Sequence, residues 1–144
     1  MPSIPFRPAG IDHVVLRVAN PARSLAFYEG VLGLKLERHQ ENIGLWQLRA
    51  GTSLIDLVSL DGVVGRRGGA GPAREARNVD HMALAIRPFH RPALAAHLAA
   101  HHVEIEGGAD DNYGATGDSP ALYIRDPDGN MIELMGPGTG RASG

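Results

Sequence analysis

The stretch Val79-Asp80-His81-Met82-Ala83-Leu84-Ala85-Ile86 repeats a pattern that first occurs as Ile11-Asp12-His13-Val14-Val15-Leu16-Arg17-Val18. In each copy an aliphatic residue, an aspartate and a histidine precede an apolar run, and a helical segment opened by proline follows. Each copy also ends on a strand-like segment that carries one carboxylate. The repeat predicts that the chain consists of two similar modules.

The composition narrows the class of protein. A chain of 144 residues suits one domain, or two small half-domains that share a core. It contains no cysteine, which excludes disulfides, thiolate metal ligands and cysteine nucleophiles. The net charge of −2 argues against nucleic acid as a partner. With no signal-peptide core and no apolar run of about 18 residues, we expect a cytoplasmic protein with no membrane partner.

Both modules have the same predicted order of elements: a strand, a helix and then three strands. Module one covers about residues 10–61, with strands at 11–18, 34–37, 45–49 and 53–60 and a helix that begins at Asn20-Pro21. Module two covers about residues 79–136, with strands at 79–86, 103–106, 120–125 and 130–135 and a helix from near Pro92 to about His101. Residues 62–78 are the predicted linker, and residues 107–119 are predicted to form a polar loop. Two such βαβββ units indicate a single α+β domain.

The last strand of each module carries a carboxylate among apolar neighbours, Asp56 within 54–58 and Glu133 within 131–135. Burying an unpaired carboxylate costs several kcal/mol, so a compensating charge is needed. His13 and His81 lie on the first strands, and a divalent cation bound by all four residues would supply that charge. A one-residue shift of register would instead turn these side chains to solvent.

The ligand chemistry limits the choice of ion. Nitrogen and oxygen ligands suit Zn, Ni, Co, Mn or Fe(II). His13, His81 and Glu133 alone would form the two-histidine, one-carboxylate triad of Fe(II) oxygenases, whereas Asp56 as a fourth ligand favours another chemistry. The helical pair His97 and His101 is predicted to lie on a solvated surface. The linker arginines are also predicted to be solvated; the alternative for them is that their charge steers an anionic substrate to the site. Those arginines are Arg66, Arg67, Arg74 and Arg77.

The motifs resemble those of the vicinal oxygen chelate superfamily, which includes glyoxalase I, extradiol dioxygenases, fosfomycin-resistance proteins, bleomycin-sequestering proteins and methylmalonyl-CoA epimerase. The resemblance extends over about residues 10–136. It is carried by Ile11-Asp12-His13, by Ser24-Leu25-Ala26-Phe27-Tyr28 leading to Val31-Leu32-Gly33-Leu34, by Asp80-His81-Met82-Ala83-Leu84, and by Asp126-Pro127-Asp128-Gly129-Asn130 ahead of Ile132-Glu133-Leu134.

This resemblance implies a glyoxalase-like fold, in which paired βαβββ modules form a cupped mixed sheet around a metal, usually in a homodimer. His13, Asp56, His81 and Glu133 match by position the four metal ligands of glyoxalase I. In that lactoylglutathione lyase the metal chelates two adjacent oxygens of a hemithioacetal, and a carboxylate moves a proton between neighbouring carbons through an enediolate. The resemblance thus implies a metal-dependent isomerase acting on a small molecule, with Glu133 as the leading base and Asp56 as its partner.

The chain departs from glyoxalase I at two positions. Asp56 stands where that enzyme has a glutamate with a longer side chain. Arg17 matches an arginine that holds a glutathione carboxylate, but Leu60 stands where an asparagine would assist it, which argues against glutathione as co-substrate. The alternatives are an Fe(II) extradiol-type dioxygenase or a fosfomycin-modifying enzyme using His13, His81 and Glu133, and a metal-free binding protein of the bleomycin type.

Overall fold

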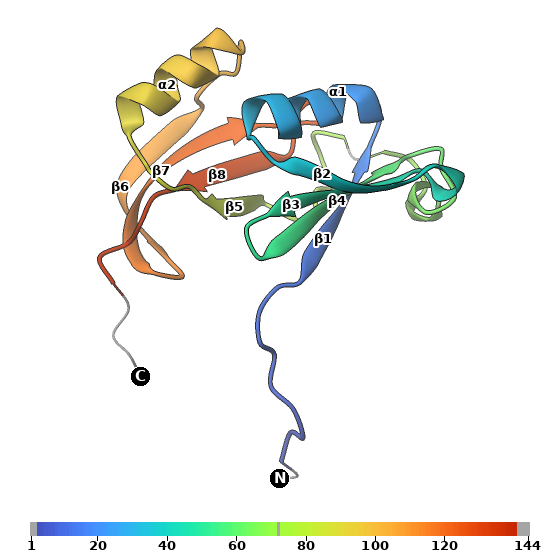
Figure 1. The fold of residues 1–144 in the computed structure, drawn as a ribbon, viewed down its shortest axis with the longest axis horizontal. Coiled ribbons are helices and arrows are strands. Elements are labelled where there is room, and N and C mark those ends of the chain that lie inside the picture. Colours follow the sequence, from blue (N-terminus) through green and yellow to red (C-terminus); the bar gives the residue numbers. More distant parts are fainter. Residues whose placement is uncertain (1–2, 72, 141–144) are drawn as a thin grey trace. The chain divides into compact units, whose positions relative to one another are not determined.

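The computed structural model describes residues 3–71 and 73–140 and consists of two compact units, Met1–Gly71 and Pro72–Gly144 (Figure 1). The division falls inside the segment predicted as a linker. Each unit contains a four-stranded mixed sheet and a helical segment, so the predicted α+β class is confirmed. Within the described residues, no helix is long and apolar enough to cross a membrane.

The sheet of the first unit has the strand order β1-β4-β3-β2, in which β1 runs parallel to β4 and the other neighbours are antiparallel. A parallel pair requires a crossover connection, and the helix between β1 and β2 begins it. β1 lies at one edge of the sheet and β4 is an inner strand. The strands are β1 (His13–Val18), β2 (Lys35–Gln40), β3 (Leu45–Ala50) and β4 (Ser53–Ser59).

The helix of this unit begins where the sequence predicts it. α1 (Pro21–Leu25) follows Asn20, whose side chain accepts a hydrogen bond from the backbone N–H of Arg23. Proline at the first helical position lacks only a donor that has no helical partner there. The helix then widens into a π-helical segment (Ala26–Val31), in which Phe27 and Tyr28 are buried and pack edge to face.

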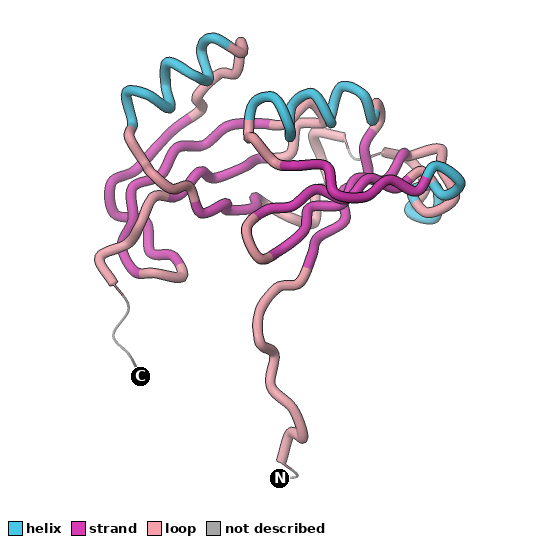
Figure 2. Tube along the Cα trace, in the orientation of Figure 1, coloured by secondary structure: helices cyan, strands magenta, loops and turns pink. Residues whose placement is uncertain are grey.

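The sheet of the second unit repeats this topology, with the order β5-β8-β7-β6 and β5 parallel to β8. Its helix, α2 (Arg91–Ala100), has His90 as N-cap, whose ring accepts from the backbone N–H of Ala93. Figure 2 shows the same succession of helix and strands in both units. The strands are β5 (His81–Ala85), β6 (Gly107–Gly114), β7 (Gly117–Arg125) and β8 (Met131–Met135).

Two predictions for the second unit are wrong. Residues 103–106 form no strand, and residues 107–119 are not a loop but β6, a tight turn and the start of β7. Gly107 pairs with Tyr123, and Gly114 pairs with Gly117 across the turn. The glycines and acidic residues of β6 have low intrinsic strand propensity, but strand formation depends strongly on context, and β7 supplies the pairing partner. A polar sequence also suits β6 because it is an edge strand.

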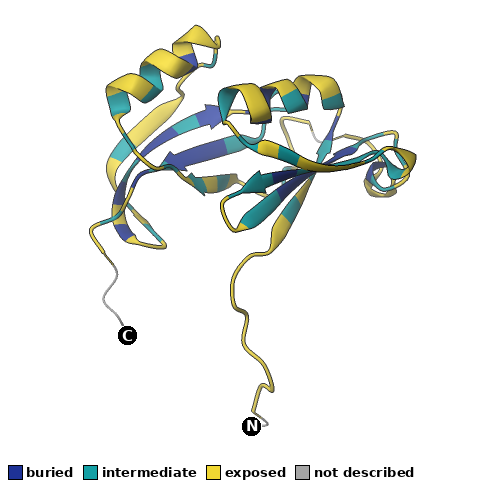
Figure 3. Cartoon of the chain, viewed as in Figure 1, coloured by how far each residue is buried: buried dark blue, intermediate teal, exposed yellow. Residues whose placement is uncertain are grey.

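The core of each unit includes alternate residues of the inner strand that carries the carboxylate. Ile55 and Leu57 of β4 are buried, as are Ile132 and Leu134 of β8, and Figure 3 shows the burial concentrated in the inner strands of each sheet. Since strand side chains alternate between faces, Asp56 and Glu133 point to the opposite face from these residues. The position of each carboxylate is therefore fixed by the apolar residues on either side of it.

Candidate metal centre

In the first unit, His13 and Asp56 lie on adjacent parallel strands and on the same face of the sheet. His13 pairs with Leu54 and Val15 pairs with Asp56, so the histidine is one same-face position away from the carboxylate. The ring nitrogen Nδ1 of His13 lies 2.7 Å from Asp12 Oδ1. A hydrogen bond from Nδ1–H to a carboxylate leaves Nε2 as the free nitrogen, which is the usual arrangement for a metal-binding histidine.

Among the described residues, Asp56 has a buried side-chain oxygen without a hydrogen-bond partner. It is only 3% exposed. Gln47 on β3 donates from Nε2 to Asp56 Oδ2 over 3.1 Å. The other oxygen, Oδ1, is buried and has no hydrogen-bond partner among the described residues. A buried carboxylate oxygen without a partner is costly, and a cation beside it would remove that cost. His13 and Asp56 therefore supply two donors of the kind that a divalent ion binds.

The second unit repeats the pair. His81 pairs with Met131 and Ala83 pairs with Glu133, which is the same offset in register as in the first unit. His81 Nδ1 lies 2.6 Å from Asp80 Oδ2, and His81 Nε2 lies 3.0 Å from Glu133 Oε2. One ring nitrogen of His81 thus contacts Asp80, and the other contacts Glu133, which is only 5% exposed.

Glu133 has further polar neighbours on β6 and β7. Asn112 donates from Nδ2 to Glu133 Oε1 over 2.7 Å and to the hydroxyl oxygen of Tyr123 over 2.7 Å. The ring of Tyr123 also meets the ring of His81 edge to face, with centroids 5.8 Å apart. Glu133 is consequently held on one oxygen by an amide and on the other by an imidazole.

The carboxylates shift the pKa values of the groups around them. The pKa of His13 is raised above its usual value, mainly by the hydrogen bond to Asp12 and also by the charge of Asp56. The pKa of His81 is raised chiefly by the hydrogen bond to Asp80, with a contribution from Glu133. Burial and the neighbouring charge of Glu133 raise the pKa of Tyr123. Without a metal, both histidines therefore favour the protonated form more than a free histidine does.

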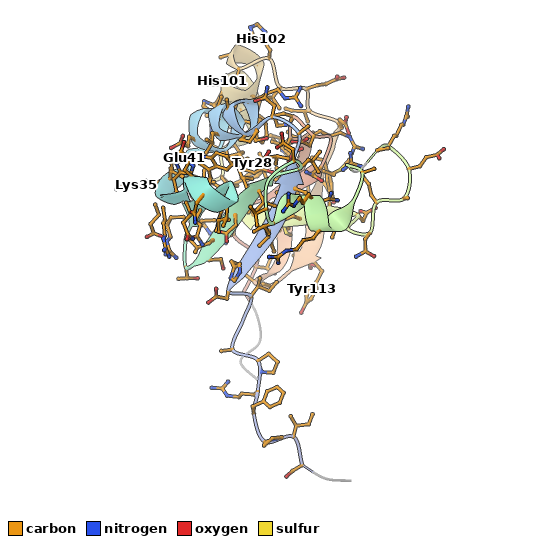
Figure 4. The ribbon with its side chains drawn as sticks, turned by 90° about the vertical axis from the view of Figure 1, so that its right-hand side faces the viewer. Tyr28, Lys35, Glu41, His101, His102 and Tyr113 are labelled. Carbon is orange, nitrogen blue, oxygen red and sulfur yellow. The ribbon has the colours of Figure 1, made fainter. Side chains whose placement is uncertain are left out.

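A pocket of about 320 Å³ opens beside the second pair. His81 and Glu133 line it, and the side chains of Met135 and Thr116 contribute to its wall. Tyr113, at the tip of the β6–β7 hairpin, also lines it and is otherwise exposed (Figure 4). The volume is at the lower end of those that hold small organic ligands.

The structure brings the four predicted ligands together as two pairs, one in each unit. Among residues 3–71 and 73–140, no three histidine, aspartate or glutamate side chains form a group that could hold a metal ion. Each pair has the same donor set, one imidazole and one buried carboxylate. A single ion bound by all four residues is not a feature of the described geometry and remains a prediction.

Arg17 has a different set of contacts from the one the resemblance implies. Its guanidinium donates to the backbone carbonyls of Gly65, Gly69 and Ala70, with 2.7 Å between Nε and the Gly65 oxygen. Arg17 therefore holds the segment that follows β4. Binding of a substrate carboxylate by Arg17 would require the guanidinium to share or release these contacts.

The other charged groups singled out in the sequence lie apart from the pairs. The exposed rings of His97, on α2, and His101, its C-cap residue, are tilted relative to each other with centroids 4.6 Å apart, and Figure 4 shows His101 at the end of that helix. Arg66 and Arg67 lie in a short 3₁₀ helix (Gly65–Gly68) and are exposed. Arg77 donates to Asn130 Oδ1 and to the backbone oxygen of Asp128, so it ties the linker to the β7–β8 turn.

Three polar residues at the pairs were not identified from the sequence: Gln47, Asn112 and Tyr123. Gln47 and Tyr123 lie directly opposite Asp56 and Glu133 in the register of their sheets. Predicting them requires the register between strands, which the repeat does not specify. Asn112 lies in the segment that was predicted to be a loop. Asp12 and Asp80 were visible as part of the repeated motif, although no role was assigned to them.

Two βαβββ units, each with a histidine on its first strand and a carboxylate on its last, define a paired-module α+β protein. The chain belongs to the Glyoxalase/Bleomycin resistance protein/Dioxygenase superfamily, whose family model matches residues 10–134. A virulence protein of Salmonella typhimurium is 29% identical over 124 residues, which cover 86% of this chain and 81% of that protein.

Solved structures show the same fold. An integron cassette protein of V. cholerae superposes with a TM-score of 0.70 at 28% identity, covering 92% of this chain and 98% of that one. A lactoylglutathione lyase from Agrobacterium tumefaciens superposes with a TM-score of 0.67 at 20% identity, covering 90% of this chain and 95% of that one. At that identity, the likeness to the lyase concerns the fold alone.

Proposed function

We propose that this protein is a metal-dependent enzyme in which His13, Asp56, His81 and Glu133 bind one divalent ion. The observation that supports this most is the buried Oδ1 of Asp56, which has no hydrogen-bond partner among the described residues. The candidate ions are Zn, Ni, Co, Mn and Fe(II), since the ligands are imidazole nitrogens and carboxylate oxygens. Two neutral imidazoles and two carboxylates would balance the charge of the ion.

The residues around the pairs suit this role. Asp12 and Asp80 accept from the Nδ1 atoms and so leave Nε2 of each ring for the ion, and Nε2 of His81 already faces Glu133. A bound divalent ion supplies Lewis-acid polarisation of substrate oxygen atoms. Because the two strands of each pair are parallel and hydrogen-bonded, the ligand positions within a pair are rigid.

The reaction that we propose is a proton transfer between adjacent carbons of a substrate with two neighbouring oxygens, as in glyoxalase I. Glu133 is the leading base, because its carboxylate lines the pocket where a small molecule would bind. It takes the proton from one carbon and returns it to the next, so the substrate is isomerised with no net gain or loss of atoms. Asp56 is its partner in the other pair, and one of its oxygens has no hydrogen-bond partner among the described residues.

The substrate is a hemithioacetal or a similar compound with vicinal oxygens. The contacts of Arg17 with three backbone carbonyls argue against glutathione held through this side chain. Other thiol adducts, and hydroxy-ketones without a thiol, avoid the need for that anchor. We therefore place the thiol-free and small-thiol substrates alongside the glutathione adduct as candidates.

The experiment is a steady-state assay of the metal-loaded protein with methylglyoxal and a panel of thiols including glutathione. Exchange of a substrate C–H for deuterium, followed by NMR, reports the proposed proton transfer for thiol-free hydroxy-ketones. We expect turnover or exchange that Glu133→Gln reduces by 100-fold or more, in line with the loss of a general base (about 10²–10⁴-fold). Background rates with every ion, by a protein shown to bind that ion, would overturn the proposed reaction.

A further inference from the structure

We infer that Gln47 and Asn112 are positioning residues, each of which holds one oxygen of a ligand carboxylate so that the other oxygen is presented to the metal. This inference rests on the proposed function, since it assigns a role toward the ion. Its basis is that, in both units, one oxygen of the buried carboxylate accepts a hydrogen bond from an amide and the other oxygen does not.

In the second unit, the two oxygens of Glu133 have different partners. Oε1 accepts from Asn112 Nδ2 at 2.7 Å, whereas Oε2 lies 3.0 Å from His81 Nε2. The oxygen beside the histidine is thus the one available to an ion that His81 also binds. The bond from Asn112 fixes the plane of the carboxylate, so that whichever oxygen the amide does not hold is turned toward His81.

In the first unit, Asp56 shows the same division. Oδ2 accepts from Gln47 Nε2 at 3.1 Å, and Oδ1 has no hydrogen-bond partner in the described part of the chain. The amide again occupies one oxygen and leaves the other. The contact recurs although the two amides come from different strands, Gln47 from β3 and Asn112 from the outer strand β6.

The orientation of the Asn112 amide is itself fixed. Its Nδ2 donates to the Tyr123 hydroxyl oxygen as well as to Glu133, and an NH₂ group has two hydrogens to donate. A flipped amide would turn its oxygen toward the carboxylate, which cannot donate, and would lose the bond to Glu133. Tyr123 therefore supports Asn112, and Asn112 supports Glu133.

Neutral amides suit this role better than cationic side chains. A lysine or arginine beside the carboxylate would neutralise it and compete with the ion, whereas an amide N–H fixes its rotation and leaves its charge in place. Outer-shell partners of this kind typically contribute 10–100-fold to metal affinity. Loss of either amide should then weaken ion binding without removing a ligand.

The test uses the full chain with Asn112→Leu and Gln47→Met, which delete the donor at nearly constant side-chain volume. The matched control is Asn130→Leu, because Asn130 Nδ2 donates to the Asp126 carboxylate at 2.8 Å in the β7–β8 turn. Affinity for Co²⁺ is measured by competition with a chelator. The visible absorption of bound Co²⁺ reports coordination, and the melting temperature of the metal-free protein reports stability.

We expect both donor-deleting variants to bind Co²⁺ 10–100-fold more weakly with an altered visible spectrum, and Asn130→Leu to keep the wild-type affinity and spectrum. Wild-type affinity and an unchanged spectrum in the folded variants would overturn the inference. If Asn112→Leu does not fold, the Co²⁺ affinity and visible spectrum of Gln47→Met, in the other sheet, test the inference. A wild-type protein that binds no divalent ion would overturn the proposed metal site itself, which distinguishes the two failures.

Discussion

His81 Nε2 lies 3.0 Å from Glu133 Oε2, with the histidine on an edge strand and the carboxylate on the neighbouring inner strand. His13 and Asp56 occupy the equivalent strands of the other sheet with the same offset in register. A duplicated module has thus kept the spacing of an imidazole and a buried carboxylate in both copies. This repetition, more than any single distance, is the structural basis of the proposed metal centre.

The stability of the protein should respond to pH in opposite ways with and without metal. The raised pKa values of His13 and His81 mean that, in metal-free protein, these groups contribute stability that is fully present below the unfolded pKa of about 6.5. That contribution is lost as the pH rises through the folded pKa. Metal binding instead needs the neutral rings, so it strengthens as the pH rises.

We therefore expect the increase in melting temperature caused by saturating Zn²⁺ to be larger at pH 8 than at pH 6. Scanning fluorimetry at both pH values, with and without the ion, measures this difference. A double variant, His13→Gln with His81→Gln, is the control and should show no metal-induced shift at either pH. An equal shift of the wild type at both pH values would contradict the assignment of these histidines as ligands.

Asp56 should reduce the stability of the metal-free protein. Asp56→Asn keeps an acceptor for Gln47 while removing a buried negative charge whose Oδ1 has no partner among the described residues. We expect the free energy of unfolding of the metal-free protein to rise by about 1–2 kcal/mol. The same substitution should remove metal binding.

The control for Asp56→Asn is Asp126→Asn. Asp126 is also buried, but its carboxylate accepts from the backbone N–H groups of Asp128 and Asn130 and from the Asn130 side chain. Removing its charge should lower stability by about 1–3 kcal/mol. Urea denaturation measures the free energy of unfolding of both variants. A change in the same direction in both would contradict this account of Asp56.

Arg17 should stabilise the segment after β4. Arg17→Met removes donors to the carbonyls of Gly65, Gly69 and Ala70, and it keeps much of the aliphatic volume. We expect amide hydrogen exchange in residues 62–71 to speed up at least tenfold. Arg66→Met, an exposed neighbour in the same segment, is the control. A large rise in KM for a carboxylate-bearing thiol adduct, with unchanged exchange, would instead assign Arg17 to the substrate.

Gly129 should be required for the turn between β7 and β8. Its φ of 82° is unfavourable for other residues, and a Cβ there would also displace the flexible end of the Arg77 side chain, whose Nη2 would lie 2.8 Å away. Gly129→Ala should therefore cost about 1 kcal/mol or more of stability. Gly30→Ala is the matched control: nothing lies within 4 Å of its added Cβ, and stability should be equal or slightly higher. Thermal denaturation compares the two, and equal losses would contradict this account of the turn.

Much of the fold follows from local sequence signals. Asn20-Pro21 predicts the start of α1, because a side-chain acceptor followed by proline matches the needs of a helix N-terminus. The burial of Asp56 and Glu133 follows from the apolar residues at alternate positions around them. These signals depend on neighbours in the chain, so a single sequence contains them.

The features that the sequence did not predict depend on partners far apart in the chain. β6 has no apolar alternation and becomes a strand through its pairing with β7. Asn112 reaches Glu133 only because that hairpin forms, and Gln47 reaches Asp56 only through the register of β3 on β4. Contacts between strands are set by register, which local propensity does not determine.

The metal content of the purified, dialysed protein, determined by mass spectrometry, shows whether the proposed site binds an ion. The comparison includes one variant from each position: His13→Ala, Asp56→Ala, His81→Ala and Glu133→Ala. We predict about one divalent ion per chain in the wild type and loss of most of it in every variant, because the site that we propose uses all four residues as ligands. A wild-type protein that holds and takes up no ion, or a loss confined to the variants of one unit, would contradict the claim.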